Sequence, residues 1–369
     1  MARRHELLAA FLGVLALGLS ACPLPANAQD PDDDPPATGS LLDPGQVVVT
    51  GFPGTILADS QQGEAGDAAR IDDTFIDPDG TVMRIIDIGG LEPGDASGGE
   101  PAEAFALPAR DIGQVFGIAI DEALNAATGK PAPNIYLGAS SAYGLHIVVP
   151  DRDGDGWPKR VETGDAEATY MEGQFGTQKG GGPGTIWKID GVTGEVAIFA
   201  DVRDRGEPNS GPGLGNLAYD PKLDVLYASD LDTGFIHAFD ANGAEVGIYD
   251  HGAAGRAAAG LPAFDDDPDN RADITTESFK SNDPTTWGYA EPPRRVLGIK
   301  THDGRLFYAV AEGPEIWSVA IGDGGRFDEP RREIALPTDA EPYEVADIAF
   351  TAAGWMILAQ RPPVTGGYD

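Results

Sequence analysis

Short apolar strands alternate with polar turns along most of this chain, and one such phrase occurs four times. Each copy has an apolar strand introduced by Gly or Asp, a polar turn and a second, aromatic-rich strand. The copies lie at 116–140, 215–230, 297–310 and 346–360, and 234–243 and 314–324 add third strands. Because such a unit cannot bury its faces alone, several must stack around an axis. The pattern therefore predicts an all-β fold, a single β-propeller.

The spacing of the copies bears on the number of blades. The Gly or Asp residues that introduce the copies are at 117, 215, 298 and 347. The interval of 98 residues between the first two leaves room for two blades. A strand–turn–strand pattern at 74–88 and a hairpin at 184–202 add further strands. We expect five or six blades, with six preferred. The strand at 46–52 is predicted to complete the last blade, since an open ring leaves an unpaired edge.

Two long polar insertions interrupt the repeats, at 151–184 and 250–293. The predicted propeller spans 45–361 as one domain with a tail at 362–369. The hydrophobic fraction of 41% supports a large core, and 50 Gly with 30 Pro among 369 residues suits a chain full of tight turns. The net charge of −35 excludes nucleic acid and anionic membrane surfaces as partners and favours cations.

The N-terminus is predicted to be an export signal. Arg3 and Arg4 precede an apolar core of 13 residues, Leu7–Leu19, which is too short for a permanent membrane span. Cleavage after Ala28 would give a signal peptide at 1–28, an acidic linker at 29–44 and a periplasmic or secreted protein. A lipobox-like phrase ending at Cys22 would instead give a lipid-anchored protein. Cys22 is the only cysteine, so an intrachain disulfide and thiol catalysis are excluded.

The segment 151–162, DRDGDGWPKRVE, fits the pattern of a calcium-binding loop. Alternating carboxylates in a tight turn suit a hard cation that takes six to eight oxygens, and a glycine at 156 permits the bend. The predicted ligands are the side chains of Asp151, Asp153, Asp155 and Glu162 and the carbonyl of Trp157. A solvated Asp/Gly turn is the alternative. A second acidic cluster at 264–270 lacks this alternation and is expected to be a solvated loop.

No catalytic motif is evident in the mature chain. Its four histidines form no zinc-binding pattern, and neither a nucleophile elbow nor a phosphate-binding loop is present. Four tryptophans, at 187, 287, 317 and 355, are expected in the core, with Trp287 the best candidate for a ligand platform. The sequence therefore favours a protein without enzymatic activity.

One stretch suggests a family. GPGLGNLAYDPKLDVLYASD, at 211–230, resembles NHL-type and gluconolactonase-like propellers, in which an Asn of a similar phrase is a calcium ligand in the axial channel. That resemblance implies a channel role for Asn216, and the matching position of the last copy is Asp347. The other two copies carry Gly there, which departs from the pattern. Nearly the whole mature chain also resembles a group of exported proteobacterial propeller proteins, which implies no particular activity.

Three hypotheses follow. The first is an exported propeller that binds a protein, a glycan or a small ligand, with calcium as a stabilising ion. The second is a calcium-dependent lactonase or hydrolase, which would need further oxygen ligands near Asn216. The third is a module of a longer envelope protein. No transmembrane segment is expected in the mature chain, and the ligand and oligomeric state are left open.

Overall fold

The computed structural model describes residues 39–57, 74–89, 101–152, 154, 156–337 and 343–362. The predicted signal peptide, Cys22 and most of the tail lie outside these residues. The described chain is mostly β-structure in small antiparallel sheets, with two short α-helices, α1 (Ala109–Ile112) and α2 (Arg256–Ala258), and a few short 3-10 and π-helical turns. No helix within the described ranges is long and apolar enough to cross a membrane.

Three sheets have four strands each, as expected of propeller blades. The first contains β6 (Val115–Ile120), β7 (Ile135–Ala139), β11 (Thr185–Ile189) and β12 (Val196–Asp201). The second contains β15 (Leu214–Asp220), β16 (Val225–Asp230), β17 (Phe235–Phe239) and β18 (Glu245–Asp250). The third contains β19 (Val296–His302), β20 (Arg305–Val310), β21 (Glu315–Gly322) and β22 (Arg326–Ala335). The repeated phrases are thus confirmed as paired strands.

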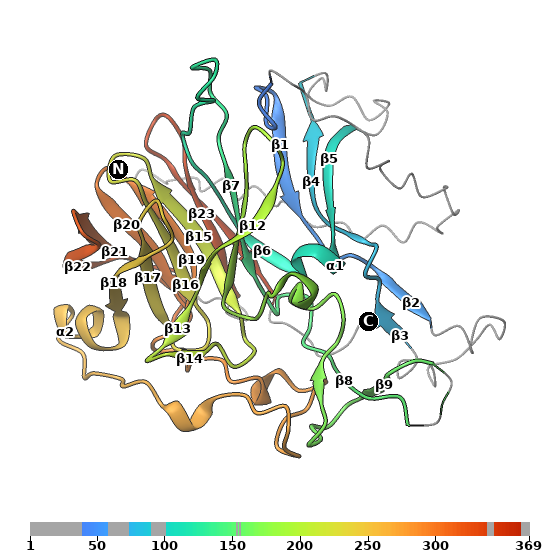
Figure 1. Cartoon of the computed structure of the whole chain (residues 1–369). Coiled ribbons are helices and arrows are strands. Elements are labelled where there is room, and N and C mark those ends of the chain that lie inside the picture. The colour runs from blue at the N-terminus through green and yellow to red at the C-terminus, as the bar shows by residue number, and fades with distance from the viewer. Residues whose placement is uncertain are drawn as a thin grey trace, which may run out of the picture.

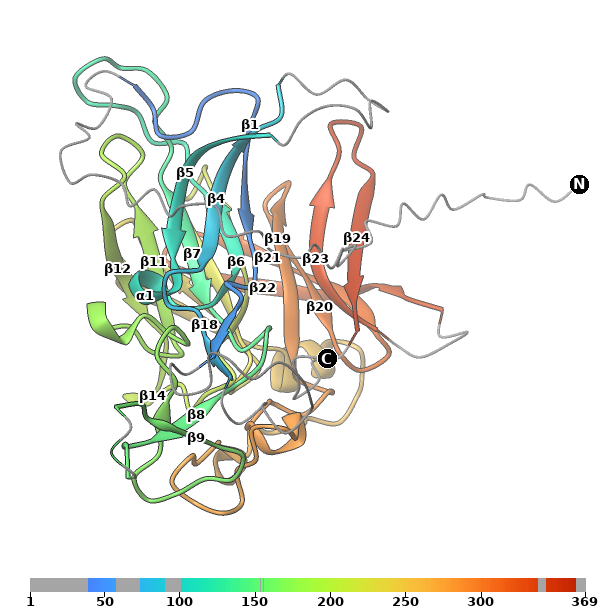
Figure 2. The same cartoon turned by 90° about the vertical axis from the view of Figure 1, so that its right-hand side faces the viewer.

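Two smaller sheets flank this series (Figures 1 and 2). One contains β1 (Gln46–Thr50), β4 (Thr81–Asp87) and β5 (Ala102–Pro108), and the other is the hairpin of β23 (Glu344–Phe350) and β24 (Met356–Arg361). The innermost strands lie side by side in the order β1, β6, β15, β19, β23. This order is propeller-like. Closure between β23 and β1, and the count of six blades, stay predictions.

The glycines that open the repeats allow the innermost strands to approach closely. A Cβ atom on Gly117 of β6 would lie 2.8 Å from the Cα of Asn216 on β15. One on Gly298 of β19 would lie 2.9 Å from the carbonyl oxygen of Val345 on β23. Real Cβ atoms do not approach so closely, so a larger residue would push these strands apart.

Apolar side chains between consecutive sheets form the core. Tyr227 and Ile236 of one blade pack with Tyr308 and Trp317 of the next, and all four are buried. Trp187 occupies the equivalent interface nearer the N-terminus. Trp355 departs from the expectation, because it lies in the turn between β23 and β24 with 73% of its surface exposed.

The strand pairing departs from expectation in several places. The segment at 46–50 pairs with β4 in the first sheet and does not pair with the last hairpin. The interval between 117 and 215, which has room for two blades, contains one four-stranded sheet, because β7 pairs with β11 across the whole first insertion. The strand at 147–149, which follows β7 in the chain, is β8 of a separate small sheet. The turn at 78–80 also joins two sheets, since β3 (Thr74–Ile76) pairs with β2 (Thr55–Leu57).

The two insertions come together at the end of the sheets where the innermost strands begin (Figure 1). The first carries β9 (Lys159–Val161) and β10 (Thr169–Tyr170), which pair with the preceding strand β8 (Ile147–Val149). The second joins it through a bridge between Thr163 and Lys280 and a backbone hydrogen bond from Ser281 N to Glu162 O of 2.8 Å. We call this combined unit the insertion lobe. Its core includes Leu145, Phe175, Phe279 and Trp287.

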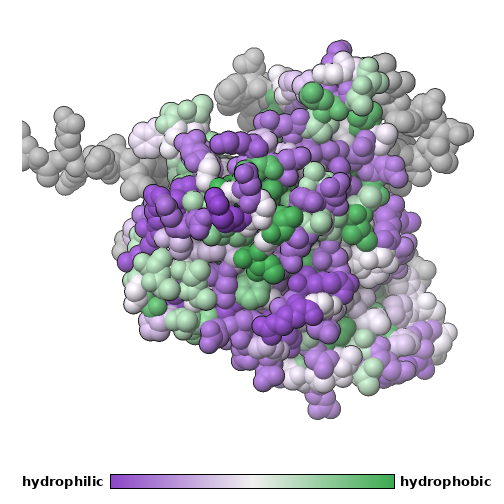
Figure 3. All heavy atoms as spheres, turned by 60° about the vertical axis from the view of Figure 1, so that its left-hand side comes forward, coloured by the Kyte–Doolittle hydropathy of each residue, from purple (hydrophilic) through white to green (hydrophobic). Residues whose placement is uncertain are grey.

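The outer face of the blades is largely hydrophilic with scattered apolar patches (Figure 3). The last strand of the third blade, β22, carries six charged residues of both signs among its ten positions. Such charges protect a free sheet edge from pairing with another chain. The concave surface of the molecule lies instead beside the insertion lobe, next to the innermost strands.

Candidate functional site

A pocket of about 430 Å³ lies between the insertion lobe and the beginnings of the innermost strands. It is built by loops from widely separated parts of the chain, which the radial arrangement of the strands brings together. Its lining is mixed, with apolar and aromatic side chains beside a few charged groups: Phe116, Ser140, Ala142, Leu231, Asn270, Pro284, Thr285, Tyr289, Glu291, Arg295, Leu297, Glu344, Arg361 and Pro362. Concave sites of this size and character typically bind small organic molecules.

Arg295 and Tyr289 form one wall of the pocket. The Arg295 guanidinium forms an ion pair with Glu344, donates to the carbonyl of Ala290 at 2.9 Å and lies 5.7 Å from the centre of the Tyr289 ring. The Tyr289 hydroxyl shares a hydrogen bond of 2.6 Å with the hydroxyl of Ser141. These contacts fix the positions of Arg295 and Tyr289 relative to each other and to their neighbours.

Phe116 and Arg361 also line the pocket. Arg361, the last residue of β24, donates from Nη2 to the carbonyl of Ala142 at 2.8 Å. Its guanidinium lies 5.2 Å from the centre of the Phe116 ring, within the range of a cation–π interaction. The last described strand is thereby attached to the loop after β7.

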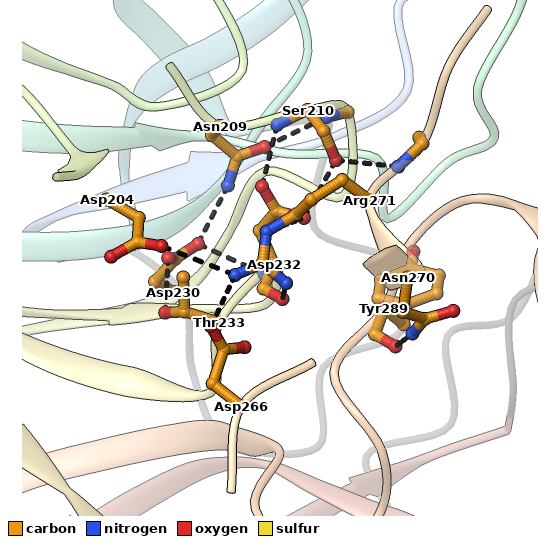
Figure 4. A network of polar contacts seen from close by, with 12 residues as sticks. Asp204, Asn209, Ser210, Asp230, Asp232, Thr233, Asp266, Asn270, Arg271 and Tyr289 are labelled. Atoms are coloured by element: carbon orange, nitrogen blue, oxygen red, sulfur yellow. Dashed lines mark hydrogen bonds and ion pairs between the residues drawn. The ribbon is translucent and has the colours of Figure 1, made fainter. Parts of the chain in front are cut away.

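A polar network beside the pocket holds the second insertion in place (Figure 4). Arg271 forms ion pairs with Asp266 at 2.8 Å, Asp204 at 3.6 Å and Asp232 at 3.7 Å. Its neighbour Asn270 lines the pocket. Asp266 belongs to the acidic cluster at 264–270, so the expectation of a merely solvated loop is wrong for this residue, whose side chain is buried.

Asp232, which belongs to this network, has a raised pKa. Burial and the neighbouring carboxylate of Asp230 raise the pKa of Asp232 to about 7. The backbone N–H and the hydroxyl of Ser210, both donating at 2.7 Å, oppose the rise, as does Arg271. Part of the population therefore carries a proton here near neutral pH.

His237 lies behind the same network, fully buried. Its Nδ1 contacts Glu245 Oε1 at 2.5 Å, and its Nε2 lies 3.8 Å from Asp230 Oδ2. Although burial disfavours the imidazolium, the two carboxylates raise the pKa of His237 to about 9. His237 is therefore a buried cation that balances the acids below the pocket.

The structure brings Asn216 and Asp347 together. Asn216 Nδ2 donates to Asp347 Oδ1 and to the carbonyl of Ala346, both at 3.0 Å, which links β15 to β23. Both residues lie outside the lining of the pocket. Within the described ranges, no group of three or more His, Cys, Asp or Glu side chains is arranged to hold a metal ion.

The predicted calcium loop lies at the edge of the insertion lobe. The carboxylate of Asp151 accepts hydrogen bonds from the N–H groups of Gly154 at 2.7 Å and Gly156 at 2.9 Å. The Trp157 ring packs on Phe75 with centroids 5.4 Å apart, and Glu162 is exposed. Asp153 and Asp155 lie outside the described residues, so the calcium site stays a prediction.

Trp287, the expected exception among the tryptophans, is part of the core. Its side chain is fully buried in the insertion lobe, and its Nε1–H donates to the carbonyl of Lys280 at 2.9 Å. It therefore offers no platform for a ligand. Sequence reasoning missed the pocket residues Tyr289, Arg295, Glu344 and Arg361, which stand in turns or at strand ends without a motif.

No protein-family model and no curated protein matches the chain. Among solved structures, it is similar to virginiamycin B lyase from Staphylococcus aureus, with 11% identity over 85% of this chain and 81% of that one, at a TM-score of 0.32. A streptogramin B lyase gives 15% identity over 69% and 70%, at 0.27. The PQQ-bound aldose sugar dehydrogenase from Streptomyces coelicolor gives 16% over 85% and 90%, at 0.26. At these values no activity, cofactor or ligand transfers to this chain.

Proposed function

We propose that this protein is a β-propeller binding module that takes up a small organic ligand in the pocket between the innermost strands and the insertion lobe. The observation that carries the proposal is the pocket itself, about 430 Å³ in volume and lined by aromatic, aliphatic and a few charged side chains. Few positions on a protein combine such enclosure with groups that fix an orientation.

The packing around the pocket supports binding by a largely preformed site. Arg295 is held by Glu344, and Arg271 is held by three aspartates next to the pocket residue Asn270. Since these side chains are already ordered, a ligand would lose little further conformational freedom of the protein on binding. A rigid pocket of this kind favours one chemical class of ligand over others.

The alternative of a calcium-dependent hydrolase has weaker support. Among the described residues, Asp347 is the one carboxylate that Asn216 contacts, and the amide group of Asn216 acts there as a hydrogen-bond donor. A hard cation would need several more oxygen ligands at that point. Ligand binding in the pocket is therefore the preferred function, in an exported protein that is either released or anchored through Cys22.

The proposal is tested by filling the pocket. A library of small organic fragments would be screened by saturation-transfer NMR against the purified chain and against Ala142→Trp, which places an indole in the cavity. We expect fragments that bind the wild type to lose binding in this variant. Ala353→Trp makes the same change in the exposed turn after β23 and should leave binding intact. Equal binding by all three proteins would show that the pocket is not the site.

A further inference from the structure

Arg361 is unusual among the arginines of this acidic chain. With 60 acidic and 25 basic residues, a guanidinium on the surface is expected to stand beside a carboxylate. Most described arginines do, including Arg84, Arg203, Arg256, Arg294 and Arg326. Arg361, in contrast, has no Asp or Glu oxygen within 4.0 Å in the described part of the chain.

The contacts of Arg361 leave much of its hydrogen-bonding capacity free. A guanidinium has five N–H donors. The structure uses one nitrogen, Nη2, for the carbonyl of Ala142, and the face of the group lies over the Phe116 ring. These contacts fix the side chain in the pocket wall without neutralising it. A positioned, unneutralised guanidinium is a suitable receptor for an oxyanion.

The carboxylates that line the pocket do not neutralise Arg361. Glu344 is bound by Arg295, and Glu291 is exposed at the rim. The charge of Arg361 also acts on the buried tyrosines of the pocket region: burial raises the pKa of Tyr289 and of Tyr143, and Arg361 works against both rises. The positive charge is therefore exerted inside the pocket, where water is partly excluded.

We propose that the ligand carries a carboxylate, which Arg361 receives, on an apolar body that packs between Phe116, Leu231 and Leu297. This inference rests on the proposed function of the pocket and names its ligand class. A single unpaired guanidinium matches one negative charge. A dianion such as a phosphate monoester would bring a second charge towards Glu291 and Glu344 in a strongly acidic protein, so a monoanionic carboxylate is favoured.

The test compares carboxylates with amides of the same shape. The probes are naphthalene-2-carboxylate with naphthalene-2-carboxamide, and octanoate with octanamide, titrated into the full purified chain by calorimetry or NMR. We expect each carboxylate to bind about tenfold more tightly than its amide, because a charge-assisted hydrogen bond replaces a neutral one. Arg361→Met should reduce the carboxylate to the level of the amide while leaving the amide unchanged, and Arg361→Lys should retain part of the preference.

Arg326→Met is the matched control, since Arg326 lies on the outer strand β22 beside Asp328. Thermal melts of each variant establish that it is folded. If amide and carboxylate bind the wild type equally, or if the preference survives in Arg361→Met, the inference about the ligand class is wrong and the pocket function stands. If no probe binds the wild type and Ala142→Trp changes nothing, both proposals fall.

Discussion

At the scale of single residues, His237 shows how the acidic interior below the pocket is balanced. It is fully buried between Asp230 and Glu245, and its raised pKa makes it cationic at neutral pH. A buried carboxylate without such a partner is strongly destabilising. The imidazolium therefore belongs to the structural support of the second blade, on which the pocket network is built.

The first prediction at this scale concerns pH. The pKa of His237 is about 9 in the folded chain against about 6.5 in an unfolded one, so its contribution is fully present below pH 6.5 and is lost as the pH rises through 9. We expect the free energy of unfolding to fall by about 3 kcal/mol over this window. Denaturant unfolding at pH 6 to 10 measures it.

The variant His237→Gln should remove most of this slope and lower stability at pH 6.5 by about 3 kcal/mol, because Asp230 loses its counter-charge. His302→Gln is the control for the loss of an imidazole, since His302 stacks on Phe350 and is partly exposed. An unchanged slope in His237→Gln would show that another group causes the pH dependence.

Single residues of the site were unequally predictable. Asn216 and Asp347 occupy equivalent positions in two repeats, so the repeat itself places them together, and the structure shows them hydrogen-bonded. Arg361 and Tyr289 gave no such signal. Arg361 is the last residue of an ordinary strand, and Tyr289 lies in an insertion whose position depends on contacts formed only in the folded chain.

At the scale of elements, local pairing was predictable and distant pairing was not. In three of the four repeats the paired strands are joined by short turns, so sequence alone indicates which strands pair. The partner of β7 lies beyond the first insertion, and the nearer strand β8 was the more obvious choice. Periodicity identifies both β8 and β11 as strands, but it does not indicate which of the two pairs with β7.

A prediction for the insertion lobe follows from its core. Phe279 is almost completely buried among side chains of both insertions, so Phe279→Ala should cost about 3–5 kcal/mol of local stability. Hydrogen exchange should rise across 272–291, and ligand binding should weaken because Thr285 and Tyr289 lie there. Leu261→Ala, an exposed position of the same insertion, is the control. Unchanged exchange in Phe279→Ala would contradict the shared core.

The predicted calcium loop is tested by calorimetric titration with calcium. The double variant Asp153→Ala/Asp155→Ala should lose binding, because two of the alternating carboxylates are removed. The matched control Asp265→Ala/Asp269→Ala removes two carboxylates from the acidic cluster of the second insertion and should bind normally. Calcium binding that survives in the first variant would place the ion elsewhere, and an absence of binding in the wild type would leave a solvated turn.

At the scale of the whole molecule, the sheets supply a frame and the insertions supply the enclosure. Consecutive sheets bury apolar faces against each other, so the frame depends on contacts between neighbours. The insertions meet each other as well as the frame, through the bridge between Thr163 and Lys280. Variation in the insertions could therefore alter the pocket while the apolar interfaces between the sheets are kept.

The hydrogen bond from Arg361 to Ala142 has a consequence for the order of events during synthesis. A chain emerges from its N-terminus, and its early blades can begin to fold while later ones are still being made. The part of the pocket that contains Phe116 and Ala142 stays incomplete while more than two hundred further residues are synthesised, because Arg361 of β24 comes near the end of the described chain. Readiness to bind is thus among the last properties the molecule acquires, and an incompletely translated or clipped chain would keep most of its blades yet be unable to capture its ligand.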